Sequence, residues 1–93
     1  DLLNDEFYEI RRDAAIGLVQ MNKPSEKVVN ILIKMVQHSL FHDKYIAIQL
    51  LRSVGKYGDS AIPVLQEELN NKHENHQEEM DTQLRKTLKE LGA

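Results

Sequence analysis

Apolar residues recur along this chain at an interval of 33 positions. Shifting the sequence by 33 places Ala14 on Ala47, Leu18 on Leu51 and Leu32 on Leu65 without a gap. Further apolar pairs share this register: Phe7 with Leu40, Tyr8 with Phe41, Ala15 with Ile48, Met21 with Val54, Val29 with Ile62, Ile31 with Val64 and Val36 with Leu69. Such an interval is typical of repeat proteins, in which each unit packs on the next. We therefore expect similar units stacked in a row.

Within each unit the apolar residues are spaced as on helices. They recur in steps of three and four and do not alternate with a period of two, so an all-α fold of five helices is expected. The second helix is apolar on more than one side and should be more buried than the first. The expected buried stripes are Ile10, Ala14, Leu18 and Met21; Val28, Val29, Ile31, Leu32, Met35 and Val36; Ala47, Leu50, Leu51 and Val54; Ile62, Val64, Leu65 and Leu69; and Met80, Leu84, Leu88 and Leu91.

Caps and breakers delimit the first three helices. The first is expected over about residues 7–22. The proline of the following "NKPS" segment cannot lie inside a helix, and Ser25 is a suitable N-cap for the second helix. The third helix is expected over about residues 43–57, and Gly58 should end it in the left-handed conformation.

Pro63 restricts where the fourth helix begins. With Ser60 as the N-cap, Pro63 is the third helical residue, and its missing N–H costs no hydrogen bond. With Asp59 as the cap, it would be the fourth residue and would lose one. We therefore expect Ser60 to cap a helix that runs to about Asn70. The polar segment "NNKHENHQ" then leads to a fifth helix that ends at Gly92.

The repeated text resembles the HEAT repeat family, especially its short subgroup. First helices of that subgroup read like R-x-A-A-x-x-L-x-x-x-G, and second helices open with G-D-x-x-A-I-P-x-L. The matching segments are "RDAAIGLVQM" (12–21), "AIQLLRSVGKYGDSAIPVLQEEL" (47–69) and "LRKTLKELG" (84–92). The first repeat departs from the pattern, with "NKPSEKVV" in place of the typical opening, and the third lacks a second helix. The resemblance implies a right-handed α-α superhelix, whereas a plain five-helix bundle is the alternative.

The resemblance also implies one domain over residues 1–93. Residues 7–38 and 40–71 would be two full repeats, 76–92 the first helix of a third, and 1–5 the end of a preceding second helix. The chain is then expected to be a fragment of a longer protein. Because both ends of such a stack are open, self-association through them is expected.

Composition excludes some chemistry and disfavours other partners. The chain has no cysteine, so disulfides and thiolate zinc sites are excluded. Its apolar runs fall short of the roughly 20 residues that span a bilayer, so no membrane partner is expected and the cytoplasm is the default compartment. The net charge of −3 disfavours nucleic-acid binding, which relies on a basic excess. Basic residues concentrated in the first two-thirds of the chain keep that reading as the third hypothesis.

The histidines raise the question of a metal site. His73 and His76 stand three apart beside Glu74, a spacing that places ligands on one helix face. The stretch is polar and lacks an apolar shell to hold metal geometry, so a solvated linker is expected. His38 and His42 flank a turn and should cap or solvate it. Some HEAT-like enzymes bind two irons through His-Glu pairs at the start of first helices, but here the only such pair lies in the linker. We expect no metal, no cofactor and no catalytic residue.

In HEAT-like solenoids the second helix of each pair lines the concave surface. Ile33 and Met35 align with Gln66 and Glu68, which look exposed, so both are either contact residues on that surface or core. The mixed charge of the surface favours a protein partner over a polyanion. The residues expected to bind the partner are Lys27, Asn30, Lys34, Gln37, Ser60, Glu67 and Asn70.

The expected function is a non-catalytic scaffold for protein–protein interaction. A structural or regulatory HEAT-like domain of a larger enzyme is the first alternative, and a nucleic-acid-binding module is the second. The acidic residues of the C-terminal third, among them Glu67 and Glu68, are expected to be a solvated face or loop.

Overall fold

The computed structural model describes residues 2–71 and 77–93, and over these residues the fold is all-α, as predicted. Five α-helices and three short 3₁₀ helices follow one another, with no strand in the described part of the chain. The elements are η1 (Leu2–Asn4), α1 (Tyr8–Gln20), α2 (Glu26–His38), α3 (Phe41–Leu50), η2 (Leu51–Ser53), η3 (Gly55–Ala61), α4 (Ile62–Asn70) and α5 (Gln77–Glu90).

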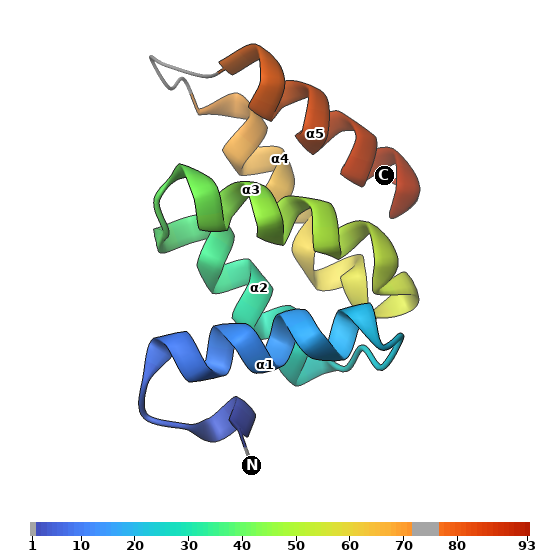
Figure 1. Ribbon diagram of the computed structural model, residues 1–93. Coiled ribbons are helices and arrows are strands. Elements are labelled where there is room, and N and C mark those ends of the chain that lie inside the picture. Colours follow the sequence, from blue (N-terminus) through green and yellow to red (C-terminus); the bar gives the residue numbers. More distant parts are fainter. Residues whose placement is uncertain (1, 72–76) are drawn as a thin grey trace.

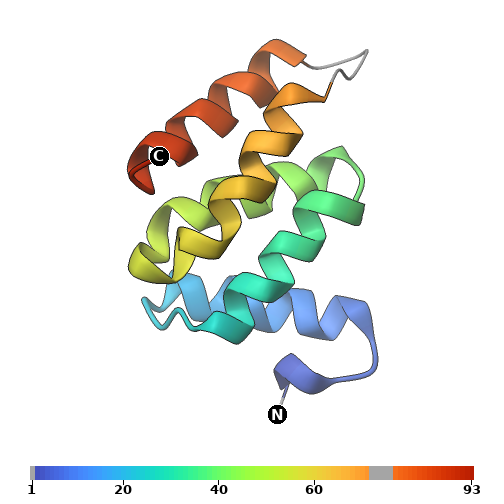
Figure 2. The ribbon, with the colours of Figure 1, turned by 180° about the vertical axis from the view of Figure 1, so that it is seen from behind.

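The helices lie in two layers. In Figure 1, α1, α3 and α5 lie in front and α2 and α4 behind, and the reverse view of Figure 2 brings α2 and α4 forward. α1 packs on α2, α2 on α3 and α4 on α5, and α2 also contacts α4 as α3 contacts α5. The Cα radius of gyration is 12.4 Å, close to the value expected for a compact domain of this length.

The core runs between the two layers and is centred on α2. Val28, Val29, Leu32, Met35 and Val36 of this helix are buried, which confirms that the second helix is more deeply packed than the first. Ser25 caps α2 as predicted, because its Oγ accepts a hydrogen bond from the Val28 amide at 3.2 Å. The remaining buried apolar residues are Ala15, Val19, Ala47, Ile48, Leu51, Val54, Ala61, Leu65, Met80, Leu84 and Leu88.

The predicted stripe on the first helix is wrong at its two ends, whereas Leu18 is partly buried against the core. Ile10 and Met21 are exposed, and the buried residues of α1 are Ala15 and Val19. Two overlapping apolar stripes lie on this helix, and the spacing alone does not choose between them. The packing of α2 against α1 decides which of the two stripes is buried.

The breaks around the third and fourth helices also differ from the prediction. α3 ends at Leu50 and continues as 3₁₀ turns, so it is shorter than expected. Gly55, not Gly58, has the left-handed conformation, with φ of 61°. Ser60 is not the N-cap of α4, because η3 extends through Ala61 and the helix begins at the next residue.

Pro63 still costs no hydrogen bond. It is the second residue of α4, where a backbone N–H has no acceptor within the helix. The predicted end of this helix at Asn70 is confirmed. The fifth helix is also confirmed, and Gly92 follows it with φ of 89°.

Candidate partner-binding surface

The residues predicted to bind a partner are exposed on α2, η3 and α4. On α2 they are Lys27, Asn30, Lys34 and Gln37, and each is exposed between buried residues that face the core. On the second unit Glu67 and Asn70 are exposed on α4, and Ser60 is exposed on η3. We call these seven residues the α2–α4 face.

The structure does not gather the seven residues into one site. Gln37 and Glu67 line one hollow, whereas Lys27, Asn30 and Lys34 line another. Ser60 borders a third beside η3, and Asn70 lines none of these three. The face is therefore a set of shallow depressions along two helices and not a single pocket.

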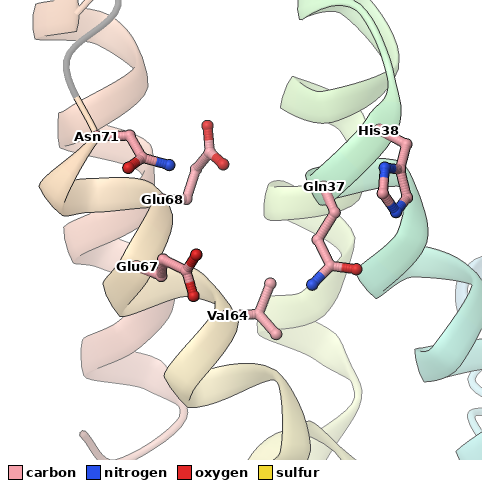
Figure 3. Close-up of a pocket in the computed structure, with 6 residues that line it drawn as sticks. All are labelled: Gln37, His38, Val64, Glu67, Glu68 and Asn71. Carbon is pink, nitrogen blue, oxygen red and sulfur yellow. The ribbon is translucent and has the colours of Figure 1, made fainter.

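The first hollow lies between the C-terminal halves of α2 and α4. It has a volume of about 270 Å³ and is lined by Gln37, His38, Val64, Glu67, Glu68 and Asn71. In Figure 3, Gln37 of α2 and Glu67 and Val64 of α4 turn toward the space between the two helices. Its lining is mostly polar, so it suits hydrogen-bonding groups of a partner.

A buried ion pair borders this hollow. Lys44 of α3 places its Nζ 2.8 Å from Oε2 of Glu68, and their side chains are only 13% and 8% exposed. Glu68 was expected to be exposed, and that prediction is wrong. The signal that would have found it is the register: Glu68 stands 33 residues after Met35, which is fully buried. Met35 is accordingly a core residue, while Ile33 is partly buried and packs against the core.

The second hollow, which we call the N-terminal hollow, lies between η1, α1 and α2. It has a volume of about 240 Å³ and is lined by Leu3, Tyr8, Arg11, Lys27, Asn30, Ile31 and Lys34. Arg11 donates a hydrogen bond to the Asp5 carbonyl oxygen at 2.7 Å. Lys27 donates one to Oδ1 of Asn4 at 2.9 Å. These bonds attach the N-terminal segment to α1 and α2.

Polar contacts connect α1 to α3. The Tyr8 hydroxyl donates to Oδ2 of Asp43 at 3.0 Å and is also hydrogen-bonded to the Ser39 hydroxyl, and Arg12 lies 3.3 Å from the same carboxylate oxygen. Partial burial raises the pKa of Tyr8. Burial by itself would also raise the pKa of Asp43, but the hydrogen bonds from Tyr8 and Arg12 outweigh it, and the pKa lies below its ordinary value.

A second set connects α3 and η2 to α5. The Arg52 side chain donates to Oγ1 of Thr87 at 2.9 Å and to the Gln83 side chain. Thr87 in turn donates to the Ile48 carbonyl oxygen at 2.9 Å. Nearer the start of α5, the Tyr45 hydroxyl donates to the Glu79 carboxylate at 2.7 Å. These polar contacts tie the helices of one layer together.

The histidines outside residues 72–76 do not form a metal cluster. Within residues 2–71 and 77–93, no three His, Cys, Asp or Glu side chains come together as a metal site would require. His38 and His42 are exposed, and Nδ1 of His42 lies 3.7 Å from Asp43. The predicted solvated linker with His73 and His76 lies outside the described residues. Among the described helices, none has both the length and the hydrophobicity needed to cross a membrane.

Comparison with known proteins finds no matching family model, curated protein or solved structure.

Proposed function

We propose that this chain is a non-catalytic protein-interaction module that binds a protein partner through the α2–α4 face. We further propose that its helices form a short right-handed superhelix of HEAT-like pairs. The observation that carries the binding proposal is that all seven predicted residues are exposed, four on α2, one on η3 and two on α4. The other sides of α2 and α4 are occupied by the core.

Burial in the two units supports the repeat. Ala15 and Ile48, and Leu32 and Leu65, are equivalent in the 33-residue register, and all four are fully buried. The alternation of helices between two layers, with contacts from α2 to α4 and from α3 to α5, is the arrangement that stacked helix pairs adopt. A stack of this kind presents one helix layer as a continuous surface.

The chemistry of the face supports a protein partner. It carries both signs of charge, with Lys27 and Lys34 on α2 and Glu67 on α4, and amides between them. Electrostatic complementarity of such a mixed surface selects a partner with a matching pattern of charge. A polyanion would be repelled by the acidic part of the face and by the net charge of −3.

The proposal is tested by selecting a random peptide library against the 93-residue chain and mapping the selected peptides by NMR. We expect the chemical shifts of backbone amides on α2 and α4 to change, including those of Lys34 and Glu67. Changes confined to α1 or α5 would contradict the proposal, and so would failure of the selection. Titration with a duplex DNA of random sequence tests the nucleic-acid alternative, which predicts binding that weakens steeply with salt.

A matched pair of variants sharpens this test. Lys34→Glu reverses a charge on the face, whereas Lys89→Glu reverses an equally exposed charge on α5. Because both side chains are exposed, neither substitution should alter folding by more than about 0.5 kcal/mol. Only the first should weaken binding of peptides that map to α2.

A further inference from the structure

We propose that the N-terminal hollow recognises an acidic segment of the partner, in which one apolar side chain enters the hollow and flanking carboxylates pair with the cations around it. This inference rests on the proposed function and adds the chemistry of the partner. Three features of the hollow support this inference. They are its size, its apolar lining residues, and cations that no described carboxylate neutralises.

The size of the hollow suits one side chain. Its volume of about 240 Å³ equals that of about eight molecules of liquid water and is smaller than pockets that enclose a drug-sized ligand. Leu3 and Ile31 are partly buried, pack against the core and form an apolar part of the lining. An aliphatic side chain of a partner placed there would leave water for an apolar surface, which favours binding.

Cations from two helices line the same hollow as these apolar residues. Arg11 comes from α1, and Lys27 and Lys34 come from α2. Within the described residues, no carboxylate forms an ion pair with any of these three. Arg11 and Lys27 donate to neutral oxygens, and the Asp5 carboxylate accepts the Phe7 amide.

Two cations elsewhere in the described residues are neutralised by carboxylates, whereas Arg52 donates to the neutral Thr87 and Gln83 side chains. Arg12 is paired with Asp13 and Asp43, and Lys44 is paired with Glu68. The N-terminal hollow therefore keeps a local positive charge on a chain that is negative as a whole. A carboxylate that reaches its rim gains charge-assisted hydrogen bonds without breaking an ion pair of the described residues.

These features favour a short acidic peptide over a polyanion. The three cations line the N-terminal hollow between η1, α1 and α2, whereas Glu67 lies on α4. A nucleic acid would extend along the face and meet that negative charge. A segment of a few residues, with one apolar side chain between glutamates, meets only the N-terminal hollow.

The probe is a peptide with neutral ends and one central leucine between two pairs of glutamates. Two control peptides replace the leucine by serine or all glutamates by glutamine. We expect NMR titration of the 93-residue chain to show shifts of the amides of Arg11, Asn30 and Lys34 at peptide concentrations of about 1 mM or below. Each control peptide should bind about tenfold more weakly, because it lacks either the apolar anchor or the charges.

Variants of the chain test the rim directly. Lys34→Glu should weaken binding of the acidic peptide about tenfold, and Lys89→Glu on α5 should leave it unchanged. Equal binding of the glutamate and glutamine peptides would overturn the inference, as would absence of shifts at about 1 mM. Tighter binding of a short DNA duplex than of the acidic peptide would also overturn it.

The outcome separates this inference from the function on which it rests. If library peptides map to the α2–α4 face but the acidic probe does not bind, the chemistry proposed for the N-terminal hollow is wrong and the function stands. If no library peptide maps to the face, the proposed function itself fails.

Discussion

The two helix pairs, α1 with α2 and α3 with α4, share a register but fill it with different chemistry. Leu32 and Leu65 occupy equivalent places and are both fully buried. Three residues further along each helix the pairs differ, because Met35 of α2 corresponds to Glu68 of α4 in the 33-residue register. Glu68 remains buried because Lys44 of α3 neutralises it at 2.8 Å. At this position the two pairs share burial, and a residue of a neighbouring helix decides whether the position accepts a charge.

The pairs differ also in how much apolar surface they leave exposed. Met21 is 60% exposed, whereas Val54 at the equivalent position is 1% exposed. Among described residues, the large apolar side chains that are exposed all lie in the first 40 positions: Leu2, Phe7, Ile10, Met21 and Leu40. The exposed positions of α5 at the other end of the stack are polar.

The largest expected effect tests the shared part of the register. Leu32→Ala and Leu65→Ala should each lower the free energy of unfolding by about 2–5 kcal/mol, because each removes a fully buried side chain and leaves a cavity. Urea denaturation measures both. If the free energy of unfolding of either variant fell by less than about 1 kcal/mol, the two leucines would not be equivalent core residues, because that loss is below the range for a core leucine.

The second test addresses the place where the pairs diverge. Lys44→Met should cost about 2–4 kcal/mol, because it removes the cation that lies 2.8 Å from the buried Glu68 carboxylate. The double variant Lys44→Met with Glu68→Met gives the second pair the residue that the first has at position 35. It should recover most of the loss, since a buried ion pair is often replaceable by apolar residues.

Lys34→Met is the control for that cycle. It removes an exposed lysine of α2 and should change the free energy of unfolding by no more than about 0.5 kcal/mol. A double variant that is no more stable than Lys44→Met alone would mean that the second pair needs the ion pair for its packing.

The third test concerns the junction between the pairs. The folded-state pKa of Asp43 lies below its ordinary value of 3.8, so its stabilising contribution is present above that pH and is lost as the pH falls through the folded-state pKa. Asp43→Asn should therefore cost about 1 kcal/mol at neutral pH, through weaker bonds from Tyr8 and Arg12. The difference in free energy of unfolding between the variant and the wild type should become smaller at acidic pH. A difference that is constant from neutral pH to about pH 2, well below the ordinary pKa, would contradict this account.

The smallest expected change in the free energy of unfolding concerns a position that carries a side chain only in the second pair. Gly17 lies inside α1 where Leu50 stands in the next unit, and a Cβ added there meets nothing within 4 Å. Gly17→Ala should therefore stabilise the chain by about 0.5–1 kcal/mol through helix propensity. Thermal unfolding followed by circular dichroism measures the gain. A loss of stability would show that α1 tolerates no side chain on that side.

Much of the fold was predictable because it depends on short-range spacing. The helical class, the Ser25 cap and the burial of Leu32 and Leu65 follow from residues a few positions apart. The residues of α2 and α4 that are predicted to bind a partner are exposed, because they alternate with the apolar stripe at helical spacing, and their binding stays a prediction. Their division among separate hollows was not predictable, since it depends on the contours between helices.

The predictions that were wrong concern residues whose conformation depends on tertiary contacts. Gly58 is buried, and a Cβ there would meet the Leu91 side chain at the end of α5. Its small size thus fits a contact with a segment more than 30 positions away, whereas Gly55 supplies the left-handed turn. Likewise, 3₁₀ turns through Ala61 displaced the start of α4 beyond Ser60.

The sequence by itself determined that the chain is helical and that the second helix carries the main buried stripe, because helix periodicity and hydrophobic spacing are properties of neighbouring residues. Only the tertiary structure decided which stripe of α1 faces inward, that Lys44 is the partner of Glu68, and that Arg11, Lys27 and Lys34 line one hollow. These outcomes depend on what a side chain meets across a helix interface. Such contacts join residues far apart in the chain and leave no periodic mark within it.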